Sequence, residues 1–531
     1  MSYQEFLAVK KKLKNTWTPF FGQFGKLLPI QIKTIPLVLG GKNLIVSSPT
    51  ASGKTEAIVA PIIERHIQEK WEGLSILYIS PTRALVNDIE KRLKGILTEC
   101  NVSLSVKTGD KRQFKPEKAT NMLITTPESL DSLLCRHPYV FKGIRVVVLD
   151  EIHILDNTYR GDQLLLLLKR LKGKTESHFN IYALSATIAD CVELGERYLE
   201  TFEIVEVEGA REIKYTLIPE LEDIVPYLRN EKLNKVLVFC NKRKSVEALA
   251  VECKNLKTPL EVVAHHGNLG RTIREEAENF MKSSKSGICV STMTLEIGID
   301  IGDIDVVVIA EIPWTVSSLL QRIGRANRRS NVNRAFGIYN SKDFIKSALE
   351  KMFELAIKGG LESKPYAPDL SVVVQQIFSL LFANRRGLEE DQFESFFENF
   401  CSTKNLKSIL EHLEDKEWIY KKMEKWYGSE KLMNIGEAGF IHANIPDETS
   451  MSVIDVSSKK LVGNILFPVD NVFILAGRVW KIAKVQGQRI LVKKVDSKAY
   501  LPDFELKNDI GKYFYYLPES LRKRKFDVDN I

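Results

Sequence analysis

The chain has 531 residues, of which 44% are hydrophobic and 27% are charged, and its formal net charge is +8. This composition is that of a globular protein with sizeable cores, and the length suits three or four domains. No apolar run approaches the roughly 20 residues of a membrane span and no apolar leader is present, so we expect a cytoplasmic protein. The seven scattered cysteines form no Cys-x-x-Cys pair, which favours reduced thiols and excludes the usual zinc pattern.

A loop of small residues ending in Lys54-Thr55 follows an apolar run over residues 43–46 and precedes a predicted helix over residues 56–68. A tight loop between a strand and a helix N-terminus binds phosphate, because free N–H groups and the helix dipole both favour an anion. We expect Lys54 to reach the β- and γ-phosphates of a nucleotide and the Thr55 hydroxyl to contact Mg²⁺. Ser48 stands where this pattern usually has Gly. An ordinary turn with a surface lysine is the alternative.

Beyond this loop, the same unit repeats: a short apolar run that ends in a polar cluster. Helical stretches separate the runs, which indicates a parallel sheet with helices on both faces and a ligand site at the strand C-termini. The clusters lie at residues 80–83, 125–128, 150–153 and 185–187, and the rhythm restarts at residue 235 with clusters at 240–241, 265–267, 291–292 and 311. We therefore predict two α/β domains of similar build, with Val207–Pro219 as the linker between them.

Two polar groups complete the predicted phosphate site. Asp150 and Glu151 end a strand that we expect to neighbour the strand of the phosphate loop; Asp150 would hold Mg²⁺ and Glu151 would orient the attacking water as general base. In the second domain, residues 321–329 contain four arginines. Their three-residue spacing predicts one helix side that carries Arg322, Arg325 and Arg328, with a surface salt-bridge face as the alternative. Across a cleft, Arg325 and Arg328 would act as arginine fingers on the γ-phosphate, so that ATP joins the two domains.

The texture of the sequence changes after residue 365. Three short segments with helical spacing, around residues 370–381, 393–400 and 406–413, precede a strand-like region at residues 418–426, which suggests a winged helix. From about residue 441 the pattern becomes strands, which predicts a small antiparallel sheet or barrel. Three tryptophans of this part, Trp418, Trp426 and Trp480, are either core residues or platforms for bases.

The motifs of residues 29–329, taken as a set, resemble those of superfamily 2 helicases, and the chain is most similar to the Lhr family of DNA helicases. Gln31 resembles the adenine-reading residue of the Q motif, residues 49–55 motif I, 81–85 motif Ia, 126–130 motif Ib, 150–153 motif II and 185–187 motif III. Residues 291–300 match motif V and residues 321–329 motif VI, with Asn327 where many relatives have Gly. Residues 439–447 and 473–480 also read like the Lhr passage from winged helix to a β-rich domain, which looks abbreviated here.

The resemblance implies two tandem RecA-like domains, followed by a winged helix and a small β-rich domain. We place the boundaries at residues 1–210, 211–364, 365–440 and 441–531. The implied cofactors are ATP and Mg²⁺. The implied catalytic set is Lys54, Asp150, Glu151, Gln321, Arg325 and Arg328; the nucleotide would also contact Gln31, Pro49, Thr50, Ala51, Ser52, Gly53, Thr55, Gly298 and Asp300. Contacts to single-stranded nucleic acid would come from Thr82, Arg83, Gly109, Thr126, Thr292 and Thr294, and coupling from His153, Ser185 and Thr187.

Three functions compete. The first is an ATP-dependent 3′-to-5′ translocase on single-stranded DNA that unwinds DNA duplexes or RNA:DNA hybrids, in DNA repair or genome maintenance; the direction and the DNA preference come from the resemblance. An RNA helicase of the DEAD-box type is the second, and the Asp-Glu-Ile-His sequence with an appended winged helix speaks against it. The third is a nucleotide-gated clamp or assembly subunit that binds nucleic acid without unwinding it.

Overall fold

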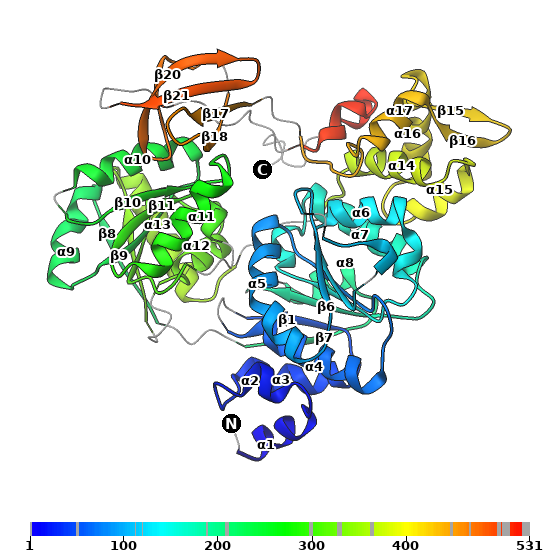
Figure 1. Cartoon of the computed structure of the whole chain (residues 1–531), viewed down its shortest axis with the longest axis horizontal. Coiled ribbons are helices and arrows are strands. Elements are labelled where there is room, and N and C mark those ends of the chain that lie inside the picture. Colours follow the sequence, from blue (N-terminus) through cyan, green and yellow to red (C-terminus); the bar gives the residue numbers. More distant parts are fainter. Residues whose placement is uncertain are drawn as a thin grey trace.

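The computed structural model shows four parts, each with its own sheet (Figure 1). The N-terminal part and the winged helix lie together, and the second α/β part carries the small β-sheet. None of the described helices is long and apolar enough to cross a membrane. The structure describes residues 3–48, 52–111, 113–118, 120–186, 190–207, 212–256, 258–296, 301–326, 332–361, 366–446, 450–466, 469–495, 501 and 510–522.

The first α/β part is built on a parallel sheet of seven strands in the order β3-β4-β2-β5-β6-β1-β7. Its strands are β1 (Leu44–Ser47), β2 (Ile76–Ile79), β3 (Leu104–Lys107), β4 (Met122–Thr125), β5 (Val146–Leu149), β6 (Asn180–Ser185) and β7 (Glu203–Glu206). The strands are short and apolar because both faces are covered by helices, and each face has its own buried cluster. The helices are α1 (Tyr3–Lys12), α2 (Trp17–Phe21), α3 (Pro29–Leu39), α4 (Lys54–Glu69), α5 (Arg83–Glu99), α6 (Pro127–Arg136), α7 (Tyr159–Lys172) and α8 (Cys191–Tyr198).

The second α/β part has a parallel sheet of six strands in the order β10-β11-β9-β12-β13-β8. Its elements are β8 (Glu212–Ile218), α9 (Val225–Asn230), β9 (Lys235–Phe239), α10 (Arg243–Asn255), β10 (Val262–His265), α11 (Arg271–Ser283), β11 (Gly287–Ser291), β12 (Val306–Ile309), α12 (Val316–Ile323), β13 (Val332–Ile338) and α13 (Asp343–Ile357). The predicted linker Val207–Pro219 is therefore wrong over most of its length: β8 pairs with β13 along seven residues. Two tandem parallel-sheet domains of the RecA type are confirmed.

A winged helix follows, as predicted. It consists of α14 (Ser371–Ala383), β14 (Leu388–Glu389), α15 (Glu390–Phe397), α16 (Thr403–Asp415), β15 (Ile419–Lys422), β16 (Lys425–Gly428) and α17 (Glu430–Glu437). The strand-like region predicted over residues 418–426 forms a hairpin of β15 and β16, because Met423 and Glu424 both take positive φ and turn the chain. The helix α14 packs against α6 and α7 of the first domain. The 3₁₀ turn η6 (Lys512–Tyr516) returns to this module, where Tyr513 is buried beside Phe378.

The small β-rich part is a sheet of five strands in the order β18-β17-β21-β20-β19, from β17 (Met451–Asp455), β18 (Leu461–Ile465), β19 (Val472–Leu475), β20 (Arg478–Gln486) and β21 (Arg489–Lys494). The predicted antiparallel pattern needs a correction, because β17 and β21 pair in parallel. The sheet shares one apolar cluster with the second RecA-like domain, and a β-bridge joins Gly463 to Leu269. Trp480 and Trp426 are buried and Trp418 is half-buried, so these three rings serve the cores.

Candidate ATP and nucleic-acid site

The phosphate loop connects β1 to α4, as the sequence predicts. Gly53 precedes α4 at φ 83°, a backbone conformation that favours glycine, and a Cβ there would lie 2.5 Å from the Gln31 amide and would displace it. The Lys54 ammonium is buried and donates to the Ser48 carbonyl at 2.5 Å. Burial lowers the pKa of Lys54, and the nearby Glu151 and Asp150 carboxylates oppose that shift. Pro49, Thr50 and Ala51 lie outside the described residues.

Gln31 lies against this loop, on α3. Its side-chain oxygen accepts from the Leu28 N–H at 2.8 Å and its amide donates to the Gly53 carbonyl at 3.4 Å. A hollow of about 320 Å³ opens beside it, lined by Phe20, Phe21, Phe24, Lys26, Leu28, Gln31, Ser52, Gly53, Lys54, Thr55, Glu56, Arg92 and Glu151. Phe24, 62% exposed, and Arg92 belong to this site although the sequence analysis missed them. Phe24 lies close to Gln31 in the sequence, and this proximity could have identified it as a site residue.

Asp150 and Glu151 follow β5, and β6 separates that strand from β1. The expectation that the two strands are neighbours was therefore wrong by one strand. Lys54 nevertheless interacts electrostatically with both carboxylates. Burial and the adjacent Glu151 raise the pKa of Asp150 to about 7. Glu151 takes φ 44°, and its Oε2 is buried without a hydrogen-bond partner among the described residues. Because Mg²⁺ prefers oxygen ligands, the Thr55 hydroxyl and the Asp150 carboxylate fit this ion.

His153 connects the acid pair to two further motifs. Its Nδ1 accepts from the Ala186 N–H at 3.2 Å and lies 3.1 Å from the Ser185 hydroxyl. Its Nε2 lies 2.7 Å from the side-chain amide of Gln321, on α12 of the second domain. Burial lowers the pKa of His153, so the ring is neutral and carries its proton on Nε2. The structure places the Gln321 Nε2 at this position, and a ring that donates through Nε2 pairs with this amide only when the amide is turned so that its oxygen faces the ring. Thr187 lies outside the described residues.

The arginines of motif VI differ from the prediction. α12 ends at Ile323, so Arg322 and Arg325 do not share one helix side. Both guanidiniums are buried: Arg322 pairs with Glu296 at 3.0 Å, and Arg325 donates to the Glu296 carbonyl at 2.7 Å. The tight turn after Ile323 redirects the chain, and Glu296 attracts both cations. Arg328, Gly298 and Asp300 lie outside the described residues.

The predicted nucleic-acid contacts lie at the carboxyl edges of both sheets. Thr82 caps α5 by accepting from the Leu85 N–H at 3.3 Å. Arg83 crosses Gly109, where a Cβ would lie 2.8 Å from its guanidinium. Thr126 precedes α6. In the second domain the Thr292 and Thr294 hydroxyls lie 3.3 Å apart, and Thr294 also lies 2.9 Å from His265 Nδ1. The structure thus brings these residues together in two groups, one on each domain.

Comparisons with known proteins agree with this geometry. Residues 28–194 match the family model of the DEAD/DEAH box helicase, and residues 217–330 match the helicase conserved C-terminal domain. The ATP-dependent helicase Lhr-Core of Methanocaldococcus jannaschii is 30% identical over 94% of this chain and 65% of its own length. The protein of the same name from Sulfolobus acidocaldarius is 29% identical, over 88% of this chain and 60% of its own.

The chain belongs to the Lhr family of DEAD/DEAH-box helicases. It spans about 60 to 65% of the length of these two relatives. Solved structures show the same fold. Mycobacterium smegmatis helicase Lhr bound to single-stranded DNA and AMP-PNP matches with a TM-score of 0.71 and 24% identity, over 82% of this chain and 62% of that one. The helicase MrfA bound to DNA and AMPPNP matches with a TM-score of 0.74 and 21% identity, over 91% and 72%.

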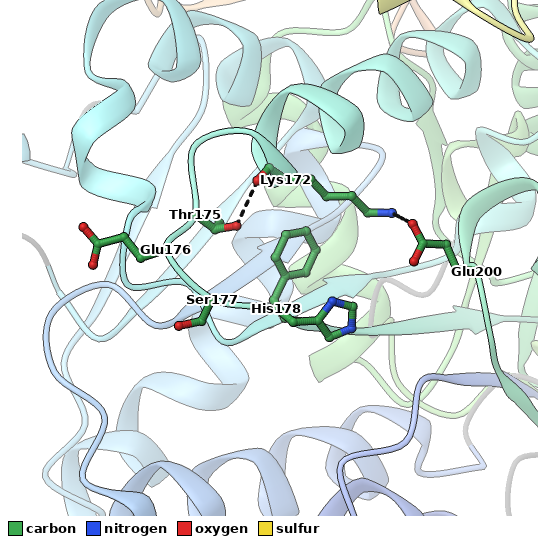
Figure 2. A pocket seen from close by; sticks show the side chains of 7 residues that line it. Lys172, Thr175, Glu176, Ser177, His178 and Glu200 are labelled. Carbon is green, nitrogen blue, oxygen red and sulfur yellow. Dashed lines mark hydrogen bonds and ion pairs between the residues drawn. The ribbon is translucent and has the colours of Figure 1, made fainter.

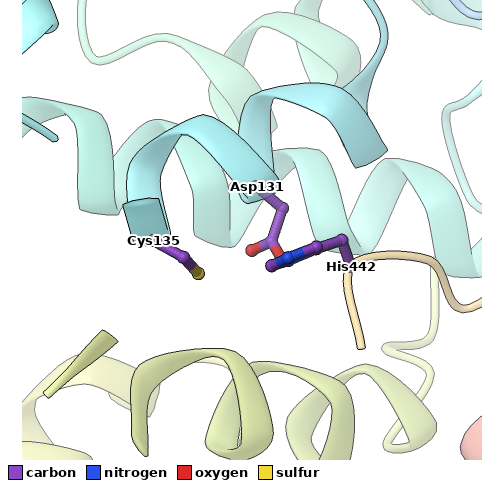
Figure 3. Close-up of side chains that lie close together, drawn as sticks. All are labelled: Asp131, Cys135 and His442. Carbon is purple, nitrogen blue, oxygen red and sulfur yellow. The ribbon is translucent and has the colours of Figure 1, made fainter. Parts of the chain in front are cut away.

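This Lhr-family chain also holds a buried charged cluster that the sequence analysis missed. Asp131 and Cys135 of α6 meet His442, from the segment after α17 (Figure 3). The His442 Nδ1 lies 2.7 Å from Asp131 Oδ2, and Arg170 of α7 lies 2.6 Å from Asp131 Oδ1 and 3.3 Å from Cys135. Although burial opposes it, the bond with Asp131 raises the pKa of His442 to about 9. Two cations already satisfy Asp131, so the cluster is an ion-pair joint and does not suit a metal ion.

A further hollow of the Lhr-family chain, of about 260 Å³, lies at the other edge of the first sheet (Figure 2). It is formed where α7 ends and β6 begins, and the Lys172 ammonium on its rim pairs with Glu200 at 2.7 Å. Lys172 and Glu200 satisfy each other, and the predicted catalytic residues lie at the strand C-termini instead. The hollow therefore adds nothing to the site.

Proposed function

We propose that this protein is an ATP-dependent helicase that translocates 3′ to 5′ along single-stranded DNA and unwinds DNA duplexes or RNA:DNA hybrids. The observation that carries the proposal is the contact of His153 with both Ser185 and Gln321. The neutral ring of His153 follows the acid pair in the chain. It contacts the end of strand β6 at Ser185 and the second RecA-like domain at Gln321. A change at the nucleotide can therefore alter how the two domains meet, which is what a motor requires.

In this proposal ATP lies over Gly53 and Lys54 with its adenine beside Gln31 and Phe24. The buried Lys54 ammonium binds the β- and γ-phosphates, with Ser52 and the loop backbone at 49–51 beside it. Thr55 and Asp150 would hold Mg²⁺, which would stabilise the charge on the phosphates. Glu151, with its unpartnered oxygen, orients the attacking water. Arg325, Arg328, Gly298 and Asp300 complete the site from the second domain when the Arg325–Glu296 contact rearranges.

Single-stranded DNA would cross the two groups of residues at the sheet edges, Thr82, Arg83, Gly109 and Thr126 on one domain and Thr292 and Thr294 on the other. The solved structures of Lhr, bound to single-stranded DNA, and of MrfA, bound to DNA, support DNA as the partner. The 3′-to-5′ direction and a role in DNA repair or genome maintenance rest on the resemblance to the family. His153, Ser185 and Thr187 would couple hydrolysis to movement.

The test compares ATPase stimulation and strand displacement on DNA, RNA and hybrid substrates that carry either a 3′ or a 5′ tail. We expect a 3′-tailed substrate with a DNA loading strand to be unwound and a 5′-tailed one to remain intact. Glu151→Gln should bind ATP but lose displacement, with activity reduced by about 10²- to 10⁴-fold. Stimulation by RNA alone, or displacement by the Glu151→Gln variant at the wild-type rate, would refute the proposal.

A further inference from the structure

Trp314 presents a large apolar ring to solvent. It lies between β12 and α12, and 74% of its surface is exposed. All six tryptophans of the chain fall within the described residues, and the other five are buried or half-buried. Packing an indole ring normally removes 150–250 Å² from water, so its exposure forgoes a large hydrophobic gain. A tryptophan exposed to water at the carboxyl ends of the strands of the second sheet, where the predicted contacts lie, is a candidate for binding a ligand.

The backbone that carries Trp314 is held on both sides. Ahead of it, the Asn241 side chain donates to the Ile312 carbonyl at 2.7 Å. Behind it, Thr315 caps α12 by accepting from the Ser318 N–H at 3.0 Å. Asn241 in turn accepts from Arg322 at 3.0 Å, so the loop is tied to motif VI. Because the loop is already ordered, binding to the ring does not have to order the backbone.

The position of the ring matches that of the predicted strand contacts. Strands β11, β9 and β12 are consecutive in the second sheet, and all three end at the same edge. β11 leads to Thr292 and Thr294, and β12 leads to Trp314, two strands away, or about 10 Å. Between them β9 leads to Asn241 and then to the three cations at residues 242–244. Cations beside an exposed aromatic ring are the combination that binds single strands without reading sequence.

We propose that Trp314 stacks on the face of a nucleobase. This inference rests on the proposed function and adds a binding residue to it. The base has two possible sources, an unpaired base of the bound strand or the adenine of the nucleotide. If the base belongs to the strand, the adjacent cations at residues 242–244 would face its phosphodiester backbone. If the base is adenine, the link to the nucleotide site is helix α12, which leads from Trp314 to Gln321, about 10 Å along the helix.

Fluorescence of the full chain gives the direct test, because stacking on a base quenches an indole. Oligo(dT) without nucleotide and AMP-PNP without DNA are titrated separately into wild type and Trp314→Phe. We expect quenching in one titration and its loss in Trp314→Phe. Trp314→Ala should weaken that ligand by about 5- to 100-fold, the range of one base–aromatic stack, whereas Trp314→Phe should stay within a few-fold of wild type.

Tyr139→Ala is the matched control. Tyr139 is 53% exposed and lies in the turn η2 (Pro138–Phe141) before β5, at the opposite edge of its sheet. Its replacement should change neither titration. Weaker oligo(dT) binding by Trp314→Ala identifies the strand as the source, and a raised KM for ATP alone identifies adenine. If wild type binds and hydrolyses normally while Trp314→Ala equals it in both, the inference is overturned; if wild type does neither, the proposed function itself fails.

Discussion

His153 Nε2 lies 2.7 Å from the side-chain amide of Gln321, and this contact joins the segment after the acid pair of the first RecA-like domain to helix α12, where motif VI begins, in the second. Since Nδ1 accepts from the Ala186 N–H, the ring donates through Nε2. The bond therefore has a direction, from the first domain to the second. Any variant at position 321 must offer an acceptor to keep it.

Replacing Gln321 tests this direction. Gln321→Ala should leave ATP binding within a few-fold of wild type and lower the number of base pairs unwound per ATP by about tenfold, because one part-buried hydrogen bond of roughly 1.4 kcal/mol is lost. Gln321→Glu keeps an acceptor oxygen and should retain most of the coupling. Coupling is measured as the ratio of displacement rate to ATPase rate. Equal ratios for all three proteins would show that the contact does not transmit hydrolysis.

Gly53→Ala should weaken nucleotide binding through two separate effects. The positive φ costs about 1 kcal/mol, and the added Cβ would approach the Gln31 amide to 2.5 Å. We expect ATP affinity to fall by more than tenfold in equilibrium titration. Gly73→Ala is the control, because Gly73 also has positive φ (60°) but nothing within 4 Å of its Cβ. The control should lose stability alone; loss of ATP affinity in both variants would contradict the role of the clash.

His442 should make the stability of the chain depend on pH. Its pKa is raised in the folded chain, to about 9 from 6.5, by the bond with Asp131, and Cys135 and Arg170 complete its surroundings. The stabilisation is thus fully present below pH 6.5 and is lost as the pH rises through 9. Urea unfolding of wild type and His442→Gln should differ by on the order of 2 kcal/mol at pH 6 and converge near pH 10. A constant difference across this range would show that His442 is not charged.

Removal of Arg170 should be among the most destabilising single changes in this joint. The guanidinium and the Asp131 carboxylate are both buried, at 6% and 0% side-chain exposure, so Arg170→Ala leaves a buried anion with only His442 for charge. We expect a loss of about 3–5 kcal/mol in unfolding free energy. Lys142→Ala breaks the exposed pair with Glu176 and should cost less than 1 kcal/mol. A loss below 1 kcal/mol for Arg170→Ala would mean that the joint relaxes around the gap.

Local patterns located most of the site. The phosphate loop, the Asp150-Glu151 pair and the Thr82 cap all depend on a strand that ends in a polar residue, which a short window of sequence reveals. The order of the strands in the sheet cannot be read from such a short window. Whether β5 borders β1 depends on where β6 inserts, and that is a choice of long-range pairing which residues 146–149 do not encode locally.

What the sequence left open has a common cause, because it depends on contacts between distant segments. Three-residue spacing placed Arg325 on a helix, but Glu296, 29 residues earlier, binds it after the helix has ended. Asp131 and His442 are 311 residues apart, so no motif window holds both. Trp314 could be told from Trp480 only by packing: Trp480 donates to the Leu475 carbonyl inside a core that the second RecA-like domain shares.

The return of η6 to the winged helix has a mechanical consequence. The chain leaves that module, builds the five-stranded sheet on the second RecA-like domain, and comes back at residues 510–522. This path adds two covalent tethers between the halves of the motor to the connections at residues 207–212 and 361–366. The shorter of the two, from Pro446 to Met451, can extend to at most about 18 Å. However widely the nucleotide cleft opens, the two halves cannot separate by more than this length where the segment joins them. The length of the segment therefore sets an upper limit on the domain movement in one cycle.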